Sequence, residues 1–306
     1  VTSHIMLTDR CNHTCAFCSV QARAGDSLPY YDVLAYLDIL MSYGLKAVIL
    51  SGGGNPILYK CKETGRNFND VVEAIHARGL EIGLITNGMP LRKHMYERGV
   101  EGKMVVRESW GTVRPATLDK LTWVRISMSG LDHKENEVYV PDINPSKTTL
   151  GFSYVAHDIY TEPADPHHGK VSRVLDLISG DTKREPDLYF EERIDTLTNR
   201  IKMYVKAYSP RYVRLLPNCL EPELISRRVE QLEKMADIIN FAVDRECVFV
   251  QYKPPAAPKA CYLGYVHPVL NCDGYVYPCD SCVLNETAVH SFANPWRVCH
   301  WRDVAS

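Results

Sequence analysis

Hydrophobic runs rich in β-branched residues alternate with segments of helical periodicity from residue 4 to about residue 245. This alternation favours parallel strands joined by crossover helices. Six runs predict strands, at residues 4–8, 47–51, 81–86, 123–127, 149–154 and 212–216. The expected fold is α/β, either a doubly wound sheet or a partial barrel. In both, ligands bind at the carboxyl ends of the strands.

Apolar residues spaced three or four positions apart predict helices in the crossovers. These helices are expected at residues 30–44, 67–79, 91–99, 131–147, 189–208 and 222–245. Gly44, Gly79 and Gly99 stand where glycine commonly ends a helix. Polar stretches rich in proline and glycine predict two loops, at residues 100–120 and 156–188.

The composition changes after the proline-rich stretch VQYKPPAAPKAC at residues 250–261. We therefore expect one domain at residues 1–250 and a small Cys-rich domain at 251–306. The second segment is too short to bury a strong core of its own and is a candidate for stabilisation by a metal. Within it, DGYVYP predicts a tight hairpin with Gly274 at the turn.

Charge and composition narrow the classes of partner. A formal charge of −2 over 306 residues gives no bulk attraction to nucleic acid or to an anionic membrane. No apolar run approaches the roughly 18 to 20 residues that span a bilayer, and no signal peptide is recognisable, so we expect a cytoplasmic protein. Eleven cysteines in a reducing compartment indicate ligation of a metal rather than disulfide bonds.

Three of these cysteines, Cys11, Cys15 and Cys18, form the pattern C-x3-C-x2-C directly after the first predicted strand. A structural zinc site takes four protein ligands, so three cysteines leave zinc one ligand short. His13 lies between two of the cysteines and is poorly placed to complete the same tetrahedron. A [4Fe–4S] cluster with three Cys ligands instead leaves one iron open to a small molecule.

The segment CNHTCAFC resembles the signature of the radical S-adenosylmethionine (SAM) superfamily, with Phe17 as the aromatic residue that shields the cluster. This resemblance implies a partial (βα)6 TIM-like barrel. It also implies that SAM chelates the open iron through its amino and carboxylate groups. An electron from the reduced cluster then cleaves SAM to methionine and a 5′-deoxyadenosyl radical, which abstracts hydrogen.

ILSGGGNPIL follows the second predicted strand and is similar to the G-G-E-P element of the superfamily. The resemblance implies that Gly52, Gly53, Gly54 and Asn55 contact the amino group of SAM, chiefly through backbone carbonyls. Asn55 stands where an acid is usual, which weakens any expected role for its side chain. An ordinary tight turn is the alternative interpretation of this glycine run.

Later strands end in further motifs of this kind. LITNG resembles the T-N-G element, which places Thr86 and Asn87 in the SAM pocket, with helix capping as the alternative. VRISMSG resembles the S-L-D-G element, which implies a contact from Ser127 to SAM, while Ser129 replaces the acid. In YVRLLPN, the resemblance implies that Leu216 lies against adenine.

The segment from Cys261 to Cys279 resembles the C-x(9–15)-G-x4-C element of SPASM and twitch domains, which carry auxiliary [4Fe–4S] clusters. The shortage of further cysteines favours the single-cluster twitch type. The ligands expected from this resemblance are Cys261, Cys279, Cys282 and Cys299, with Cys272 as the alternative to Cys282. A zinc site with four thiolates remains open, because the same set of ligands suits zinc.

The predicted function is that of a radical SAM enzyme that abstracts hydrogen from a small metabolite such as a sugar, a nucleoside or an antibiotic precursor. The auxiliary cluster would then complete an oxidation or a bond-forming step. Modification of a ribosomally made peptide and a zinc-stabilised binding protein are the alternatives. An electron donor such as flavodoxin or ferredoxin is the implied protein partner. No general base is identified, and the candidates by location alone are His157, Asp158, His167 and His168.

Overall fold

The structure is a computed structural model, and its described part leaves out several segments. The described residues are 1–15, 17–18, 23–89, 95–98, 104–107, 113–132, 137–157, 188–218, 222–252, 262–279 and 297–304. Cys261 and Cys282, two of the expected auxiliary ligands, lie outside them, as do Asp158, His167 and His168.

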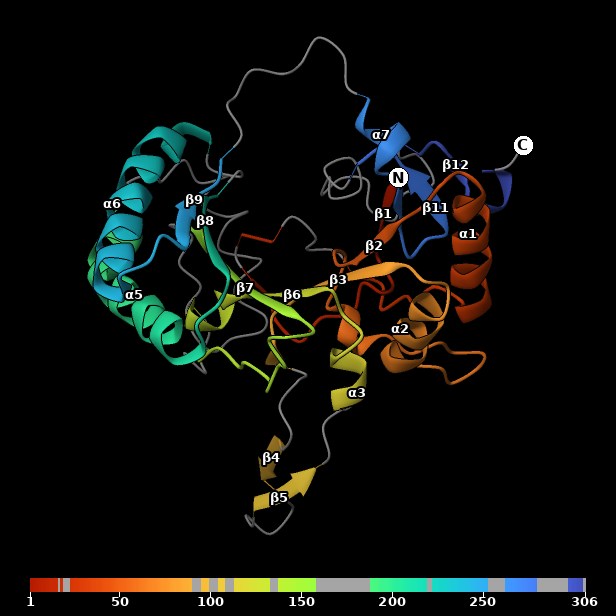
Figure 1. The fold of residues 1–306 in the computed structure, drawn as a ribbon, viewed down its shortest axis with the longest axis horizontal. Coiled ribbons are helices and arrows are strands. Elements are labelled where there is room, and N and C mark those ends of the chain that lie inside the picture. Colours follow the sequence, from red (N-terminus) through yellow and green to blue (C-terminus); the bar gives the residue numbers. More distant parts are fainter. Residues whose placement is uncertain are drawn as a thin grey trace, which may run out of the picture.

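All six strands predicted from the hydrophobic runs are present and pair in parallel with one another. They are β1 (Thr2–Ile5), β2 (Ala47–Leu50), β3 (Glu81–Thr86), β6 (Trp123–Ser127), β7 (Thr149–Ala156) and β8 (Tyr212–Pro217). They stand in this order across the sheet, as in a partial barrel (Figure 1). Parallel order brings their carboxyl ends to one edge, where the sequence motifs follow.

Four further strands extend this sheet to ten, and three of them belong to the Cys-rich segment. At one edge β9 (Val248–Val250) pairs in parallel with β8. At the other edge β10 (Val269–Leu270) pairs in parallel with β1 and is followed by the antiparallel strands β11 (Tyr275–Tyr277) and β12 (Cys299–His300). Gly274 turns the predicted hairpin between β10 and β11 with φ +82°. The C-terminal segment therefore continues the main sheet.

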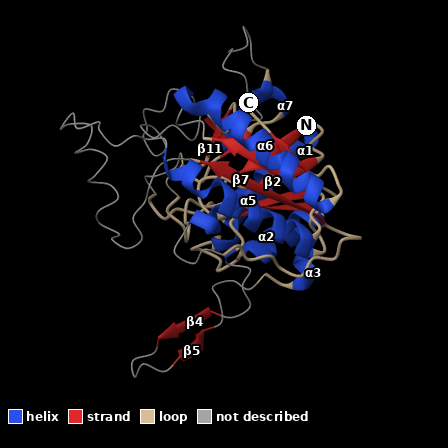
Figure 2. Cartoon of the chain, turned by 90° about the vertical axis from the view of Figure 1, so that its left-hand side faces the viewer, coloured by secondary structure: helices blue, strands red, loops and turns tan. Residues whose placement is uncertain are grey.

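Helices cover the outside of the curved sheet, as Figures 1 and 2 show. They are α1 (Tyr30–Ser42), α2 (Phe68–His76), α3 (Pro115–Leu118), α5 (Leu188–Tyr208), α6 (Ile225–Val243) and the short α7 (Leu263–Val266). Gly44 and Gly79 follow α1 and α2 with positive φ, as expected of residues that end helices. None of the described helices is both long enough and apolar enough to cross a bilayer.

The two faces of the sheet differ in burial. On the outer face Val124, Ile126, Phe152 and Leu215 are fully buried in one core cluster with the apolar side chains of the helices. Side chains that alternate with these point to the inner face, because successive residues of a strand face opposite sides. Most of those on β6, β7 and β8 are only half-buried. Solvent therefore reaches the inner face of the sheet.

Two predicted helices are wrong. Part of the expected helix at 91–99 is instead β4 (Met95–Arg98), which pairs with β5 (Met104–Arg107) in a hairpin apart from the main sheet (Figure 2). Strand pairing here overrides the helical propensity of the sequence. The expected helix at 131–147 is replaced by a 3-10 helix, Met128–Asp132, and residues 137–148 contain no α-helix. Two prolines, at positions 141 and 145, disfavour a helix in that stretch.

Candidate active site at the carboxyl ends of the strands

Three thiols lie together in segment 10–23, called here the thiol loop, which follows β1. Cys11, Cys15 and Cys18 are half-buried, and the amide of Cys18 donates to the carbonyl of Cys15 over 3.0 Å. Burial raises the pKa of Cys15 to about 12; the Ser129 hydroxyl opposes this rise, and the charges of the other two thiols add to it. Burial is also the main reason that the pKa of Cys11 is raised. These couplings place the three thiols as neighbours.

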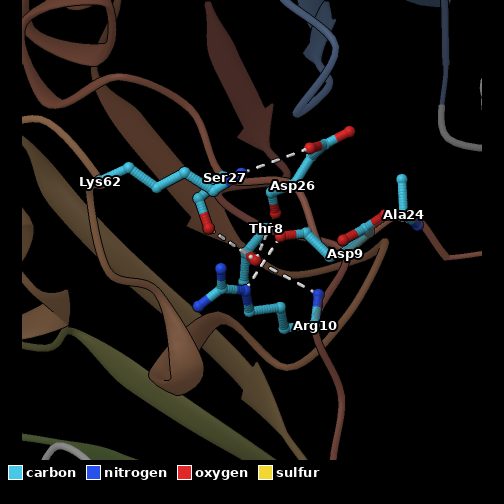
Figure 3. A network of polar contacts seen from close by, with 8 residues as sticks. Thr8, Asp9, Arg10, Ala24, Asp26, Ser27 and Lys62 are labelled. Carbon is cyan, nitrogen blue, oxygen red and sulfur yellow. Dashed lines mark hydrogen bonds and ion pairs between the residues drawn. The ribbon is translucent and has the colours of Figure 1, made fainter.

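The ends of the thiol loop are held together by the polar network in Figure 3. Thr8 and Ser27 form an antiparallel bridge, and the Thr8 hydroxyl donates to the carbonyl of Asp26 over 2.6 Å. The Asp9 carboxylate accepts a hydrogen bond of 2.7 Å from the amide of Ala24. Because Asp9 is fully buried, this bond is shielded from water. The loop is thus closed at its base by residues on both sides of the thiols.

A positive charge stands beside the thiols. The guanidinium of Arg23 donates to Cys18 Sγ over 3.3 Å and to the carbonyl of His13 over 2.9 Å. It also acts to lower the pKa of Cys11. A cation next to a thiol favours the thiolate, the form that binds metal. Sequence reasoning missed Arg23, because nothing in its spacing marks it as part of the motif.

The glycine run packs directly against the backbone of the thiol loop. Gly52 and Gly53 adopt positive φ of +76° and +60°, a region that favours glycine. The amide of Gly54 donates to the carbonyl of Thr8 over 2.9 Å. A Cβ on Gly54 would overlap the carbonyl oxygen of Arg10. Because glycine has no side chain, the backbones of the two segments can touch, and this contact positions the thiol loop. The glycine run therefore has a role in addition to the SAM contact expected from the sequence.

Asn55 connects three of the predicted motifs. Its Nδ2 donates to Asn87 Oδ1 over 2.7 Å and to Asn12 Oδ1 over 3.3 Å, while its Oδ1 accepts from the Thr86 hydroxyl over 3.0 Å. Asn87 Nδ2 in turn donates to Asn12 Oδ1 over 3.1 Å and lies 4.0 Å from Cys11 Sγ. An amide both donates and accepts in this position, which an ionised acid cannot do. Asn12 was missed from sequence.

Changing Asn55 to Asp is expected to destabilise this network. The new carboxylate would face the Oδ1 atoms of Asn87 and Asn12 and lose both donated hydrogen bonds. Losing these bonds from buried Asn55, with a carboxylate in place of its amide, costs about 1–3 kcal/mol of unfolding free energy, measured by urea denaturation. The same change at exposed Asn199, whose Oδ1 only accepts from Lys202, is the matched control and should cost less than about 0.5 kcal/mol. Equal losses at the two positions would contradict the assigned role of Asn55.

Two further predicted contacts lie on the inner face of the sheet. Ser127 is the last residue of β6 and is in register with Ser153 of β7. Leu216 lies near the end of β8, in register with Val155. Both side chains are half-buried, on the face opposite the core cluster. The structure places them on the same side of the sheet but shows no direct contact between them.

The aromatic residue of the Cys motif packs against the end of β7. The ring centroid of Phe17 lies 5.1 Å from that of His157. His157 is buried, and its Nε2 lies 3.5 Å from Asp132 Oδ2. Arg193 donates to the other oxygen of Asp132 over 3.0 Å. His157 is therefore buried in side-chain contacts beside the thiol loop.

The described tail thiols differ in environment. Cys272 is buried in the core cluster, and burial, together with the nearby charge of Asp9, raises its pKa. Cys279 and Cys299 are half-buried, and Cys299 pairs with Val276 of β11. Burial also raises the pKa of Cys299. Whether these two share a cluster with Cys261 and Cys282 stays a prediction.

The thiol loop suits a cluster of several metal ions. Among the residues that the structure describes, no three Cys, His, Asp or Glu side chains are grouped closely enough to hold one metal ion. A [4Fe–4S] cluster does not require such a grouping, because each thiolate binds a different iron. The three neighbouring thiols, with the Arg23 cation beside them, match this ligand chemistry.

Comparisons with known proteins agree with this site. The sequence profile of the Radical SAM superfamily matches residues 5–106, from the last residue of β1 onward, which include β2, β3, the thiol loop and the glycine run. A GTP 3′,8-cyclase from Synechocystis is 32% identical over 123 residues, 39% of this chain and 36% of the relative. One from Staphylococcus epidermidis is 34% identical over 110 residues, 31% of this chain and 30% of the relative. The matches thus span about a third of these relatives.

Solved structures resemble the whole fold at low identity. SuiB from Streptococcus suis, bound to its precursor peptide SuiA, has a TM-score of 0.52 at 11% identity and covers 100% of this chain and 66% of its own. A structure of anSMEcpe with AdoMet and a peptide has a TM-score of 0.50 at 13% identity, covering 99% of this chain and 78% of its own. These likenesses support the partial barrel. The profile match over a third of the chain, together with the thiol loop, supports a radical SAM superfamily enzyme.

Proposed function

We propose that this chain is a radical SAM enzyme that abstracts hydrogen from a small metabolite such as a sugar, a nucleoside or an antibiotic precursor. The superfamily uses a [4Fe–4S] cluster and SAM. When bound, a reduced cluster and SAM supply a 5′-deoxyadenosyl radical. One observation carries the proposal. Hydrogen bonds among Asn12, Asn55 and Asn87 connect the thiol loop to the motifs that follow β2 and β3.

Each part of this site has a task in the proposal. Cys11, Cys15 and Cys18 would hold three irons of the cluster as thiolates. Arg23 would offset part of their negative charge, since it already lies 3.3 Å from Cys18 Sγ. The remaining SAM contacts in the proposal lie at or just after the carboxyl ends of strands: Gly52, Gly53, Gly54, Asn55, Thr86, Asn87, Ser127 and Leu216.

The choice of a small metabolite rests on the relatives in sequence. Both GTP 3′,8-cyclases are named for a reaction of a nucleotide, and they are 32% and 34% identical to this chain over 123 and 110 residues. The peptide-bound neighbours are 11% and 13% identical, so their likeness speaks for the fold alone. Modification of a ribosomally made peptide is therefore the second candidate.

We further propose an auxiliary [4Fe–4S] cluster held by the tail. Its ligands would be Cys261, Cys279, Cys282 and Cys299. The burial of Cys272 in the core cluster supports the choice of Cys282 over it. Such a cluster would accept an electron from the substrate, which suits an oxidation or a bond-forming step. A flavodoxin or ferredoxin would supply the electron that starts the reaction.

Anaerobic reconstitution with iron and sulfide, followed by metal analysis and an assay for 5′-deoxyadenosine, tests the proposal. The proposed enzyme binds about eight irons per chain, four for each cubane cluster, and releases 5′-deoxyadenosine when given SAM and a strong reductant. About four irons with 5′-deoxyadenosine release would remove only the auxiliary cluster. Zinc in place of iron, with no 5′-deoxyadenosine, would favour the alternative of a zinc-stabilised binding protein.

A further inference from the structure

The inner face of β6, β7 and β8 carries an ordered set of side chains below the strand ends. Arg125 is in register with Gly151 and, through it, with Tyr212. One layer nearer the strand ends, Ser127 is in register with Ser153, and Ser153 with Arg214. All of the side chains in these two layers are half-buried. They therefore line a part of the barrel that solvent reaches.

Aromatic rings lie beside and beneath these arginines. The indole of Trp123, one layer below Arg125, lies over Gly83, where a Cβ would overlap the ring. The ring of Tyr212, in the layer of Arg125, lies over Gly151 in the same way. Phe249 of β9 is in register with Arg214 and packs beside Tyr212, with ring centroids 6.5 Å apart. The two glycines allow the rings of Trp123 and Tyr212 to lie across the sheet next to the arginines.

Arg125 and Arg214 are close enough to repel each other. Burial lowers the pKa of Arg125 to about 10, and the charge of Arg214 is the second cause. Burial also lowers the pKa of Arg214. The Arg125 guanidinium lies 5.8 Å from the ring centroid of Trp123, and a hydrogen bond from Arg125 to Tyr212 acts against the lowering of its pKa. Neither contact provides a negative charge.

Within the described residues, neither arginine forms an ion pair, and the Nε atom of each is buried without a hydrogen-bond partner. Two other half-buried arginines each pair with a carboxylate. Arg193 lies 3.0 Å from a carboxylate oxygen of Asp132, and Arg297 lies 3.0 Å from one of Asp273. Partly desolvated cations without a counter-charge are costly to the folded state. Among the described residues, the positive charges of Arg125 and Arg214 are thus balanced only when an anion binds to them.

We propose that Arg125 and Arg214 bind an anionic group of the substrate, a carboxylate or a phosphate, on the inner face of the sheet. Ser127 ends β6 two residues after Arg125, and Pro217 ends β8 three residues after Arg214. At about 3.3 Å per residue, Arg125 lies about 7 Å below the end of β6. Arg214 lies about 10 Å below the end of the longer strand β8, in register with Ser127. This inference rests on the proposed function, because the reacting end of the substrate would then reach up toward the SAM site.

Two guanidiniums recognise an anion by shape as well as by charge. Each presents a planar fork of N–H donors that matches the oxygens of a carboxylate or a phosphate. A neutral substrate would leave both charges without a partner. The proposal therefore excludes an uncharged sugar and selects a sugar phosphate, a nucleotide or a carboxylic acid as the substrate class.

Isothermal titration calorimetry of the cluster-loaded chain, with inorganic phosphate and succinate as separate probes, tests this site. The wild type is expected to bind at least one of them, and the stronger identifies the group. Arg125→Gln and Arg214→Gln should each weaken that affinity about tenfold or more, since a charged hydrogen bond is lost. Arg125→Lys, which keeps the charge, should weaken it less. Exposed Arg211, replaced by Gln, is the matched control and should leave it unchanged.

A second titration separates this site from that of SAM. Saturating SAM is expected to leave the affinity for the anion unchanged, because Arg125 lies one layer below Ser127 and Arg214 lies two strands away from it. Displacement of the anion by SAM would overturn the proposal, as would a wild type that binds neither probe, or an equal loss in the Arg211→Gln control. Binding is measured without turnover. A chain that binds the anion but releases no 5′-deoxyadenosine would therefore contradict the proposed function and not the anion site.

Discussion

Replacing Cys11, Cys15 and Cys18 together with alanine is expected to remove about four irons per reconstituted chain and to reduce 5′-deoxyadenosine release to background. The three thiols neighbour one another, and the proposal assigns them every protein ligand of the SAM-cleaving cluster. Iron and sulfide analysis measures the iron content per chain. Chromatography of a reaction with SAM and a strong reductant measures the release of 5′-deoxyadenosine.

Cys247→Ala is the matched control for this experiment. Cys247 is buried in the core cluster, before β9, and has no part in the thiol loop. Its replacement should leave both the iron content and the release of 5′-deoxyadenosine unchanged. A triple variant that keeps its SAM cleavage would refute the assignment of the cluster to the thiol loop. A tail cluster, if present, would account for the iron that remains in the triple variant.

Gly54→Ala is expected to have the second largest effect. The added methyl group would overlap the carbonyl oxygen of Arg10, and backbone atoms of Asp9 and Arg10 surround the same position. A backbone carbonyl cannot turn aside as a flexible side chain can, so the thiol loop must move. We expect a loss of about 3 kcal/mol in unfolding free energy, measured by urea denaturation, and poor incorporation of iron into the loop.

Gly65→Ala provides the comparison. Gly65 has φ of +70° and open space around the position of a Cβ, so alanine there meets backbone strain but no overlap. That strain costs about 1–2 kcal/mol and should leave iron incorporation intact. If both variants took up iron equally well, the glycine run would not position the thiol loop, and its backbone contacts would be incidental.

The parallel strands could be predicted because each is a short apolar run between segments of helical period. Val48, Leu50, Ile82 and Leu84 are fully buried, as such runs imply. The boundaries were less certain. The first strand was expected at 4–8 but ends at Ile5, since Thr8 pairs with Ser27 across the thiol loop instead. That pairing depends on a contact with a later segment, which no local pattern reveals.

Strands of two or three residues were missed for a related reason. β9, β10 and β12 are too short to show a period, and they exist because a neighbouring strand offers hydrogen-bonding groups. The hairpin of β4 and β5 is a further case, since its first strand falls in a segment with helical spacing. In each of these strands, pairing with another segment of the chain decides the structure.

Some residues of the candidate site could likewise be predicted from the sequence, and others could not. Its thiols, its glycines and the Thr86–Asn87 pair stand in recognisable spacings, so sequence alone placed them near one edge of the sheet. Asn12, Arg23 and Ser129 contribute through contacts that depend on how the loops pack. Ser129 shows the difference, because from sequence it only replaced an expected acid, whereas in the structure its hydroxyl reaches Cys15.

The pairing of β1 with β10 has a consequence for how the protein is made. Most of the described sheet lies between β1 and β10 along the chain, so β1 leaves the ribosome well before its partner. During that time the nascent chain carries an unpaired strand edge close to its reactive sulfur atoms. The surroundings of the thiol loop therefore cannot be complete until β10 has been synthesised.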